Sequence, residues 1–186
     1  SHSGARALVD HPRDVPDSIL ARLPKNGGIV MVPFVNTFVS PKARAHDVAE
    51  EKVRSDAKAK FGADTAAARH EVDAWQAANP PVRASIADVA DHIEHVRDVA
   101  GIDHVGIGSD FDGIDDVIPG LENVSKFPNL LAELARRGWS DADLRKVAGE
   151  NFIRVFSQAE TVAARLQKER KASTATIAEL DGPLHP

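Results

Sequence analysis

Two short apolar runs with almost no polar interruption predict two buried strands. The first extends from Ile29 to Phe34 and the second from Val105 to Ile107. Neither run alternates with polar residues, a pattern typical of parallel strands that are covered on both faces. Residues 1–8 have the pattern of the end of a further strand, because they open abruptly without a polar lead-in. The chain is therefore expected to contribute about three strands to a parallel sheet.

Apolar and alanine residues at helical spacing fill the segments between these runs. Residues 41–80 are rich in alanine and charge, and they predict two surface helices with a break at Gly62. Ser85 and Asp88 have the spacing of a capping box. An apolar face follows them at intervals of three and four residues, and Gly101 is expected to end that helix.

Further helix starts are marked by proline or by a capping side chain. Asp14, which stands two residues before a proline, is a candidate start near the beginning of the chain. Pro128 and Ser140 mark two later starts, and the chain becomes charged beyond Thr161. The alternation of strands and helices predicts an α/β fold with a parallel sheet.

The number of strands limits which α/β fold this can be. About three strands are present, whereas a closed TIM-type barrel needs eight. We therefore expect residues 1–160 to form the C-terminal half of a (β/α)8 barrel, with a helical insertion at about 41–80. Residues 161–186 are expected to hold the end of the last helix and an exposed tail.

Composition excludes several classes of function. The net charge of -5 and the lack of a basic stripe argue against a nucleic-acid partner. The chain has no cysteine, so any metal must be held by His, Asp or Glu, which suit zinc and other divalent ions. No apolar run approaches the roughly 18 residues that a membrane helix requires, so no membrane segment is expected in this chain.

The stretch from Gly108 to Gly113 is the strongest candidate for chemistry. Asp110 follows the second strand directly, and the carboxyl ends of strands are where catalytic groups collect in α/β folds. Alternatively, Asp110 caps the turn that follows. His92 and His95 lie one helical turn apart, which fits either a metal pair or a packing and surface role.

Several motifs, taken together, resemble the membrane (renal) dipeptidase family. They are Ser1-His2-Ser3, Arg13 to Asp17, Gly108 to Gly113, Gly120 to Lys126 and Asn151 to Phe156, in this order. The resemblance covers most of the chain outside the insertion and the tail. It implies a (β/α)8 barrel, usually homodimeric, that binds two Zn²⁺ ions in each complete active site and hydrolyses dipeptides.

The resemblance also implies roles for three residues. His2 matches a zinc-binding histidine, Arg13 matches the arginine that binds the substrate carboxylate, and Asp110 matches the acidic residue beside the metal-bridging water, where it also meets the substrate's amino group. Phe38 stands where some members have a tyrosine that contacts substrate. The other metal ligands of the family lie upstream of the matched histidine, so activity is expected only with the missing N-terminal half, in the same chain or a companion.

Other readings of these residues stay open. By the resemblance, a metal-bridging hydroxide attacks the peptide carbonyl while Arg13 binds the carboxylate. His2 alternatively bonds to backbone in the core, and Arg13 alternatively forms a surface ion pair. A related metal-dependent amidohydrolase or lactonase is a second possibility, although a lactonase has little use for a carboxylate clamp. The third is a non-catalytic fragment or subunit.

Overall fold

The computed structural model describes residues 2–182, so Ser1 of the first motif and residues 183–186 of the expected tail lie outside the described part. The chain forms two compact units, Ser1–Phe152 and Ile153–Pro186. Among the described residues, no helix combines the length and the apolar character needed to cross a membrane.

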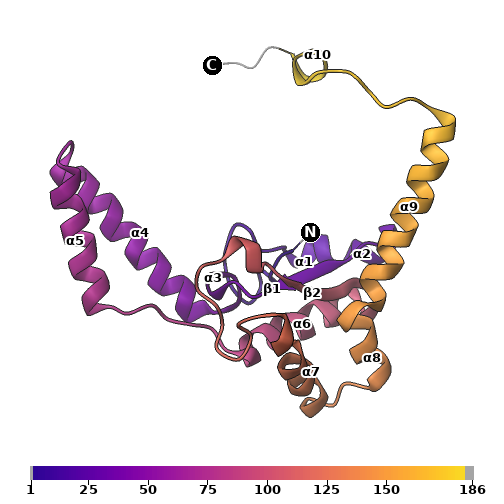
Figure 1. Ribbon diagram of the computed structural model, residues 1–186, viewed down its shortest axis with the longest axis horizontal. Coiled ribbons are helices and arrows are strands. Elements are labelled where there is room, and N and C mark those ends of the chain that lie inside the picture. The colour runs from indigo at the N-terminus through magenta and orange to yellow at the C-terminus, as the bar shows by residue number, and fades with distance from the viewer. Residues whose placement is uncertain (1, 183–186) are drawn as a thin grey trace. The chain divides into compact units, whose positions relative to one another are not determined.

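A parallel pair of strands lies at the centre of the first unit (Figure 1). Strand β1 (Val30–Pro33) pairs with β2 (Val105–Ser109), and Val30 stands opposite Val105. Both predicted strands are confirmed. Val32 and Val105 are fully buried, as expected for strands without polar alternation.

The predicted third strand is not a regular strand in the described part of the chain. A single parallel bridge joins His2 to Met31, and the Ser3 amide donates to the Met31 carbonyl at 3.0 Å. The ladder ends there because the next two amides bond elsewhere: Gly4 donates to Asp14 and Ala5 donates to His92. Among the described residues, His2 thus joins the sheet through its bridge to Met31.

Helix α6 (Ile86–Ala100) packs against both strands and buries its apolar face. Its capping box is confirmed, since Ser85 accepts from the Asp88 amide while the Asp88 carboxylate accepts from the Ser85 amide. Gly101 ends the helix with φ 94°, a backbone angle that favours glycine. The buried residues of this face include Val89, Ala90, His92, Ile93 and Val96.

Three short helices flank β1 in the sequence, two before it and one after it. They are α1 (Asp17–Leu20), α2 (Leu23–Asn26) and α3 (Asn36–Val39). The first begins at Asp17 after Pro16, and Asp14 does not cap it. The expected start at Asp14 is wrong, because that carboxylate turns into the protein interior.

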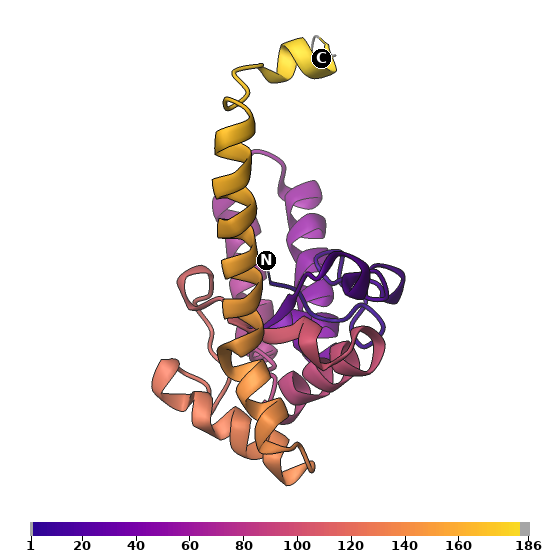
Figure 2. The same cartoon turned by 90° about the vertical axis from the view of Figure 1, so that its right-hand side faces the viewer.

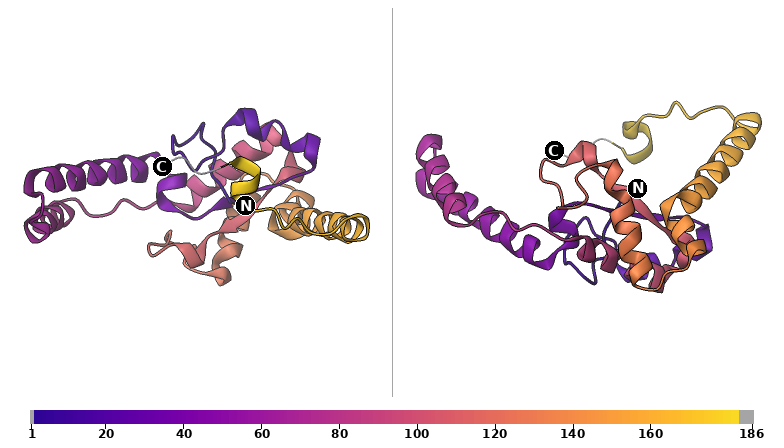
Figure 3. Two further views of the ribbon diagram at one scale, coloured as in Figure 1. Left: turned by 90° about the horizontal axis from the view of Figure 1, so that it is seen from above. Right: turned by 60° about the horizontal axis from the view of Figure 1, so that its bottom comes forward.

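The insertion is a helical hairpin, as predicted. Helix α4 (Pro41–Phe61) and helix α5 (Thr65–Ala78) lie side by side and join at Gly62, which has φ 54° (Figure 3). Ion pairs and hydrogen bonds link them, including Lys60 to Glu71 at 2.5 Å.

The rest of the first unit contains helices α7 (Phe127–Arg136) and α8 (Asp141–Arg145). The Ser140 side chain caps α8, as its sequence predicts. A π-helical turn, Lys146–Glu150, follows α8. Single 3-10 turns lie at Ile102–His104, Phe111–Gly113 and Val124–Lys126.

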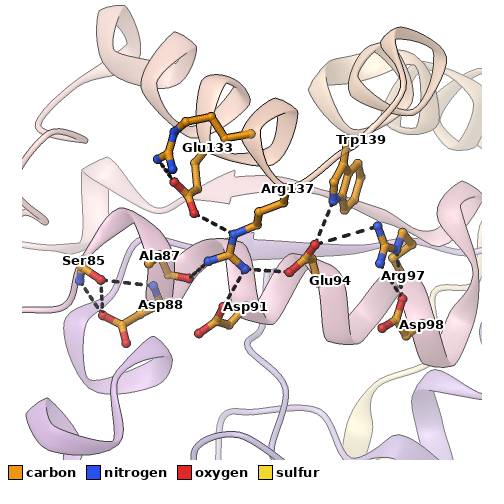
Figure 4. Close-up of polar contacts among 11 residues, drawn as sticks. Ser85, Ala87, Asp88, Asp91, Glu94, Arg97, Asp98, Glu133, Arg137 and Trp139 are labelled. Carbon is orange, nitrogen blue, oxygen red and sulfur yellow. Dashed lines mark hydrogen bonds and ion pairs between the residues drawn. The ribbon is translucent and has the colours of Figure 1, made fainter.

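Arg137 joins α7 to α6 through a network of carboxylates (Figure 4). Its guanidinium group lies 2.6 Å from Asp91, 2.6 Å from Glu94 and 2.7 Å from Glu133. The Trp139 indole donates to Glu94 at 3.1 Å. Glu133 is buried, so loss of the partly exposed Arg137 would leave its carboxylate paired only with the more exposed Arg136 among the described residues.

We expect Arg137→Ala to lower the free energy of unfolding by about 2–3 kcal/mol, because it removes a positively charged partner from partly buried carboxylates. Urea unfolding followed by circular dichroism measures this change. Arg136 also pairs with Glu133, but its side chain is 74% exposed. Arg136→Ala should therefore cost less than about 1 kcal/mol, and an equal loss in both variants would contradict the role of Arg137.

The second unit is mostly the long helix α9 (Asn151–Glu169), which has no break along its length (Figure 2). Asn151, its first residue, lies in the first unit and donates to the carbonyls of Ile102 and Val105 at 2.6 and 2.9 Å. The short helix α10 (Ile177–Asp181) begins with a capping box, and residues 170–181 are exposed.

Candidate functional site

His2 and Asp110 meet beside the two-stranded sheet, where His2 bridges to Met31 of β1 and Asp110 follows the end of β2. His2 Nε2 lies 3.2 Å from Asp110 Oδ2, although the two residues are more than one hundred positions apart in sequence. Their side chains are 26% and 24% exposed, so both remain accessible to a small molecule. The parallel arrangement explains the meeting, since strands that run in one direction end at one edge of the sheet.

The turn after β2 fixes the direction of the Asp110 side chain. Ser109 and Asp110 have φ angles of 30° and 73°, in the left-handed region that non-glycine residues rarely adopt. The Gly113 amide donates to the Asp110 backbone carbonyl at 3.0 Å. The Asp110 side chain makes no capping hydrogen bond to this turn, so its carboxylate points to His2 and the capping reading is not supported.

Gly108 allows the close approach of His2 to the sheet. A Cβ atom at Gly108 would lie 2.8 Å from the Met31 carbonyl oxygen and 2.9 Å from His2 Cβ. Real Cβ atoms do not come so close to backbone atoms, so any larger residue must displace one of these neighbours. Glycine at this position is therefore a requirement of the site.

The Arg13 guanidinium group packs against the face of an aromatic ring and forms no ion pair with the described residues. Its guanidinium carbon is 5.7 Å from the centre of the Phe38 ring, and the His11 ring lies 4.3 Å from the same ring. The Ser3 hydroxyl donates to the Arg13 carbonyl at 3.0 Å, which ties this loop to the segment that carries His2. Within the part of the chain that the structure describes, Arg13 forms no ion pair, and the structure does not bring it into contact with His2 or Asp110.

Asp14 is a buried acid that the sequence pattern does not identify. Only 1% of it is exposed, and Oδ1 accepts from the Gly4 amide at 2.9 Å. Oδ2 has no hydrogen-bond partner in the described chain. Burial raises the pKa of Asp14 to about 7, against the smaller lowering effect of the Gly4 hydrogen bond.

His92 has a packing role, and the metal-pair reading of His92 and His95 finds no support. His92 is 1% exposed, and Nδ1 accepts from the Ala5 amide at 2.8 Å. Burial lowers its pKa to about 4, so it is neutral near pH 7. His95 instead faces Asp17 at 2.8 Å. The signal in the sequence is the place of His92 on the apolar face of α6, beside Ile93.

The donor set at this edge fits part of a metal site. An imidazole nitrogen and a carboxylate are ligands that zinc and related divalent ions accept. Among residues 2–182, however, no group of three or more His, Asp or Glu side chains is arranged to hold a metal ion.

Comparison with known proteins places this site in a family context. The family model described as membrane dipeptidase, peptidase family M19, matches residues 1–170. Dipeptidase tcpJ of Claviceps purpurea (strain 20.1) is 37% identical over 164 residues, which cover 88% of this chain and 30% of that protein. An uncharacterized dipeptidase of Schizosaccharomyces pombe is 37% identical over 161 residues, 86% of this chain and 30% of that protein.

Solved structures agree with these relatives. The probable dipeptidase PvdM from Pseudomonas aeruginosa is 28% identical with a TM-score of 0.66, covering 82% of this chain and 42% of that one. A metallo peptidase from Rhodobacter sphaeroides, liganded with a phosphinate mimic of the dipeptide L-Ala-D-Ala, is 25% identical. Its TM-score is 0.56, and the match covers 82% of this chain and 33% of that one. The chain thus spans 30% of the length of the curated relatives it matches.

Proposed function

Because the chain belongs to the membrane dipeptidase family, peptidase family M19, we propose that it supplies the C-terminal half of a metal-dependent (β/α)8 barrel that hydrolyses dipeptides. The N-terminal half, in the same parent chain or a companion, supplies the rest of the barrel. We call the two halves together the assembled enzyme. The meeting of His2 with Asp110 at one edge of the sheet carries this proposal.

Arg13 binds the free carboxylate of the substrate in this proposal. A guanidinium group is always charged and offers two parallel donors, which match the two oxygens of a carboxylate. The exposed Arg13 side chain forms no ion pair within the described residues, and the Phe38 ring supports it at 5.7 Å. A fixed clamp of this kind selects substrates whose carboxylate lies at dipeptide distance from the scissile bond.

His2 and Asp110 work at the other end of the substrate. His2 would be one ligand of a divalent metal site, with two zinc ions as the family resemblance suggests. When bound, these ions supply Lewis-acid polarisation of the scissile carbonyl and lower the pKa of water. Asp110 would accept at its carboxylate a proton from the attacking water and deliver it to the leaving amine, a transfer for which a carboxylate 3.2 Å from the His2 imidazole is suited.

In this proposal the N-terminal half completes the metal site. The remaining metal ligands come from the N-terminal half, since the described residues hold no group of three or more metal-binding side chains. Two copies of the assembled enzyme form a homodimer, by resemblance to the family.

We expect Arg13→Lys to lower kcat/KM of the assembled enzyme for a dipeptide by roughly 10–100-fold, mainly through KM, because lysine cannot grip both oxygens. The same dipeptide with its terminal carboxylate converted to an amide is the diagnostic substrate. The wild type should discriminate strongly against the amide, and Arg13→Lys should lose most of this discrimination. Steady-state kinetics on both substrates measure the effect.

Arg22→Lys serves as the matched control, because Arg22 is exposed on the neighbouring helical turn and should leave both substrates unaffected. If Arg13→Lys leaves the preference for the free carboxylate unchanged, the carboxylate role is wrong. A lactonase or another amidohydrolase would then become the better interpretation, since neither needs a clamp of this kind.

A further inference from the structure

Asp14 is the buried ionisable group that the proposed reaction does not use. It follows Arg13 directly in sequence, but its carboxyl group turns inward while the Arg13 side chain is exposed. The Gly4 amide is its one hydrogen-bond donor, and Oδ2 is unpartnered in the described chain. An ionised carboxylate in such a place lacks the hydrogen bonds that it would have in water.

The contacts of Gly4 connect Asp14 with Phe38, whose ring packs against Arg13. A Cβ atom on Gly4 would lie 2.7 Å from Asp14 Oδ1 and 2.8 Å from the Phe38 carbonyl oxygen. Gly4 is therefore held tightly between Asp14 and the backbone of Phe38. The Phe38 ring in turn supports the Arg13 guanidinium group, so Asp14 reaches Arg13 through two packed neighbours.

We propose that Asp14 is a positioning residue that keeps Arg13 and Phe38 in their binding arrangement only while its own carboxyl group is neutral. This inference rests on the proposed function of Arg13. When Asp14 ionises, water and the nearby guanidinium groups compete for its carboxylate. The tight contact with Gly4 then opens, the Phe38 ring shifts, and the substrate carboxylate binds less well.

The charges around Asp14 define the pH range of this effect. The positive charges of Arg6 and Arg13, on the same loop, favour the ionised form, but burial outweighs them and raises the pKa of Asp14 to about 7. His11 and His92 lie on the elements next to it. Burial lowers the pKa of both histidines, that of His92 to about 4, so His92 is neutral over the range in which Asp14 titrates.

Asp14→Asn is the test variant, because the amide keeps an oxygen for the Gly4 amide and cannot ionise. The measurement is the ratio of the wild-type KM to the variant KM for one dipeptide, taken from about pH 6 to about pH 9 in the assembled enzyme. The ratio cancels titration of the substrate's own amino group. We expect it to be near unity at the low end and to rise roughly tenfold at the high end, with kcat unchanged.

Asp10→Asn is the matched control, since Asp10 is an exposed acid of the same loop, and its KM ratio should stay flat. Urea unfolding gives a second readout that does not depend on catalysis. The pKa of Asp14 is higher in the folded protein than in the unfolded chain, so the bound proton stabilises the folded state. This contribution to the free energy of unfolding is complete at low pH and is lost as pH rises through about 7. The wild-type midpoint should therefore fall relative to that of Asp14→Asn over this range.

A flat KM ratio in an active enzyme would overturn the proposal, and so would a variant whose KM is raised at every pH. If the wild type hydrolyses no dipeptide at all, the proposed function fails instead. In that case, equal pH dependence of unfolding in wild type and Asp14→Asn overturns the present inference as well. A different pH dependence in the two proteins would still support a neutral Asp14 in the folded state.

Discussion

Asp110→Asn is expected to lower kcat of the assembled enzyme by roughly a hundred- to ten-thousandfold while its metal content stays near that of the wild type. The amide has nearly the same shape but cannot accept a proton from the reacting water. Asparagine also tolerates the left-handed backbone found at this position, where φ is 73°. Steady-state kinetics together with metal analysis of the same preparations measure both quantities.

Asp112→Asn is the matched control, because Asp112 lies in the same turn but is exposed. It should leave kcat within about twofold of the wild type. If Asp110→Asn retains near wild-type turnover with metal bound, Asp110 is not the proton carrier. A parallel loss of metal and activity would instead make Asp110 a ligand.

Gly108→Ala is expected to have the second-largest effect, on both stability and metal binding. The new methyl group would meet the Met31 carbonyl oxygen at 2.8 Å and His2 Cβ at 2.9 Å, so His2 must move away from the sheet. We expect a loss of about 1–3 kcal/mol in the free energy of unfolding, as for an overpacked core. Metal affinity should fall by about tenfold or more, because second-shell changes that shift a ligand have effects of this size.

Gly106→Ala tests whether the effect belongs to the position or to any added methyl group in β2. A Cβ atom at Gly106 would meet the Cδ1 atom of Ile29 at 3.0 Å and the Cγ atom of Met31 at 3.3 Å. Both are side-chain atoms that can move, so metal affinity should remain near wild type. Urea unfolding and titration with Zn²⁺ compare the two variants, and equal losses would refute the steric explanation.

Local patterns predicted most of the secondary structure. The capping box at Ser85 and the glycine at 101 locate α6 because both act within one helical turn. The apolar runs locate β1 and β2 for a similar reason, since burial on both faces removes polar alternation. The strand end expected at the start of the chain is confirmed only at the bridge of His2 to Met31, because the amides of Gly4 and Ala5 bond to distant side chains that no local pattern records.

The site was predictable only where a motif or a strand end marked it. Asp110 follows an apolar run, so its place at the edge of the sheet could be inferred, whereas its distance of 3.2 Å from His2 depends on strand pairing. Asp14 looked like a helix start because a proline follows two positions later. Its burial results from packing against Gly4, which no local pattern records. The roles proposed for His2, Arg13 and Asp110 stay predictions.

The left-handed backbone conformation of Ser109 and Asp110 lowers stability at a place where the proposed function needs the Asp110 side chain. Each such residue costs about 1–2 kcal/mol relative to an ordinary backbone conformation, a cost that glycine avoids. Protein engineering for heat resistance would therefore select glycine at these two positions. The same exchange would loosen the turn or delete the carboxylate that faces His2. Attempts to stabilise this fold are better directed at the helical hairpin of the insertion, away from this turn.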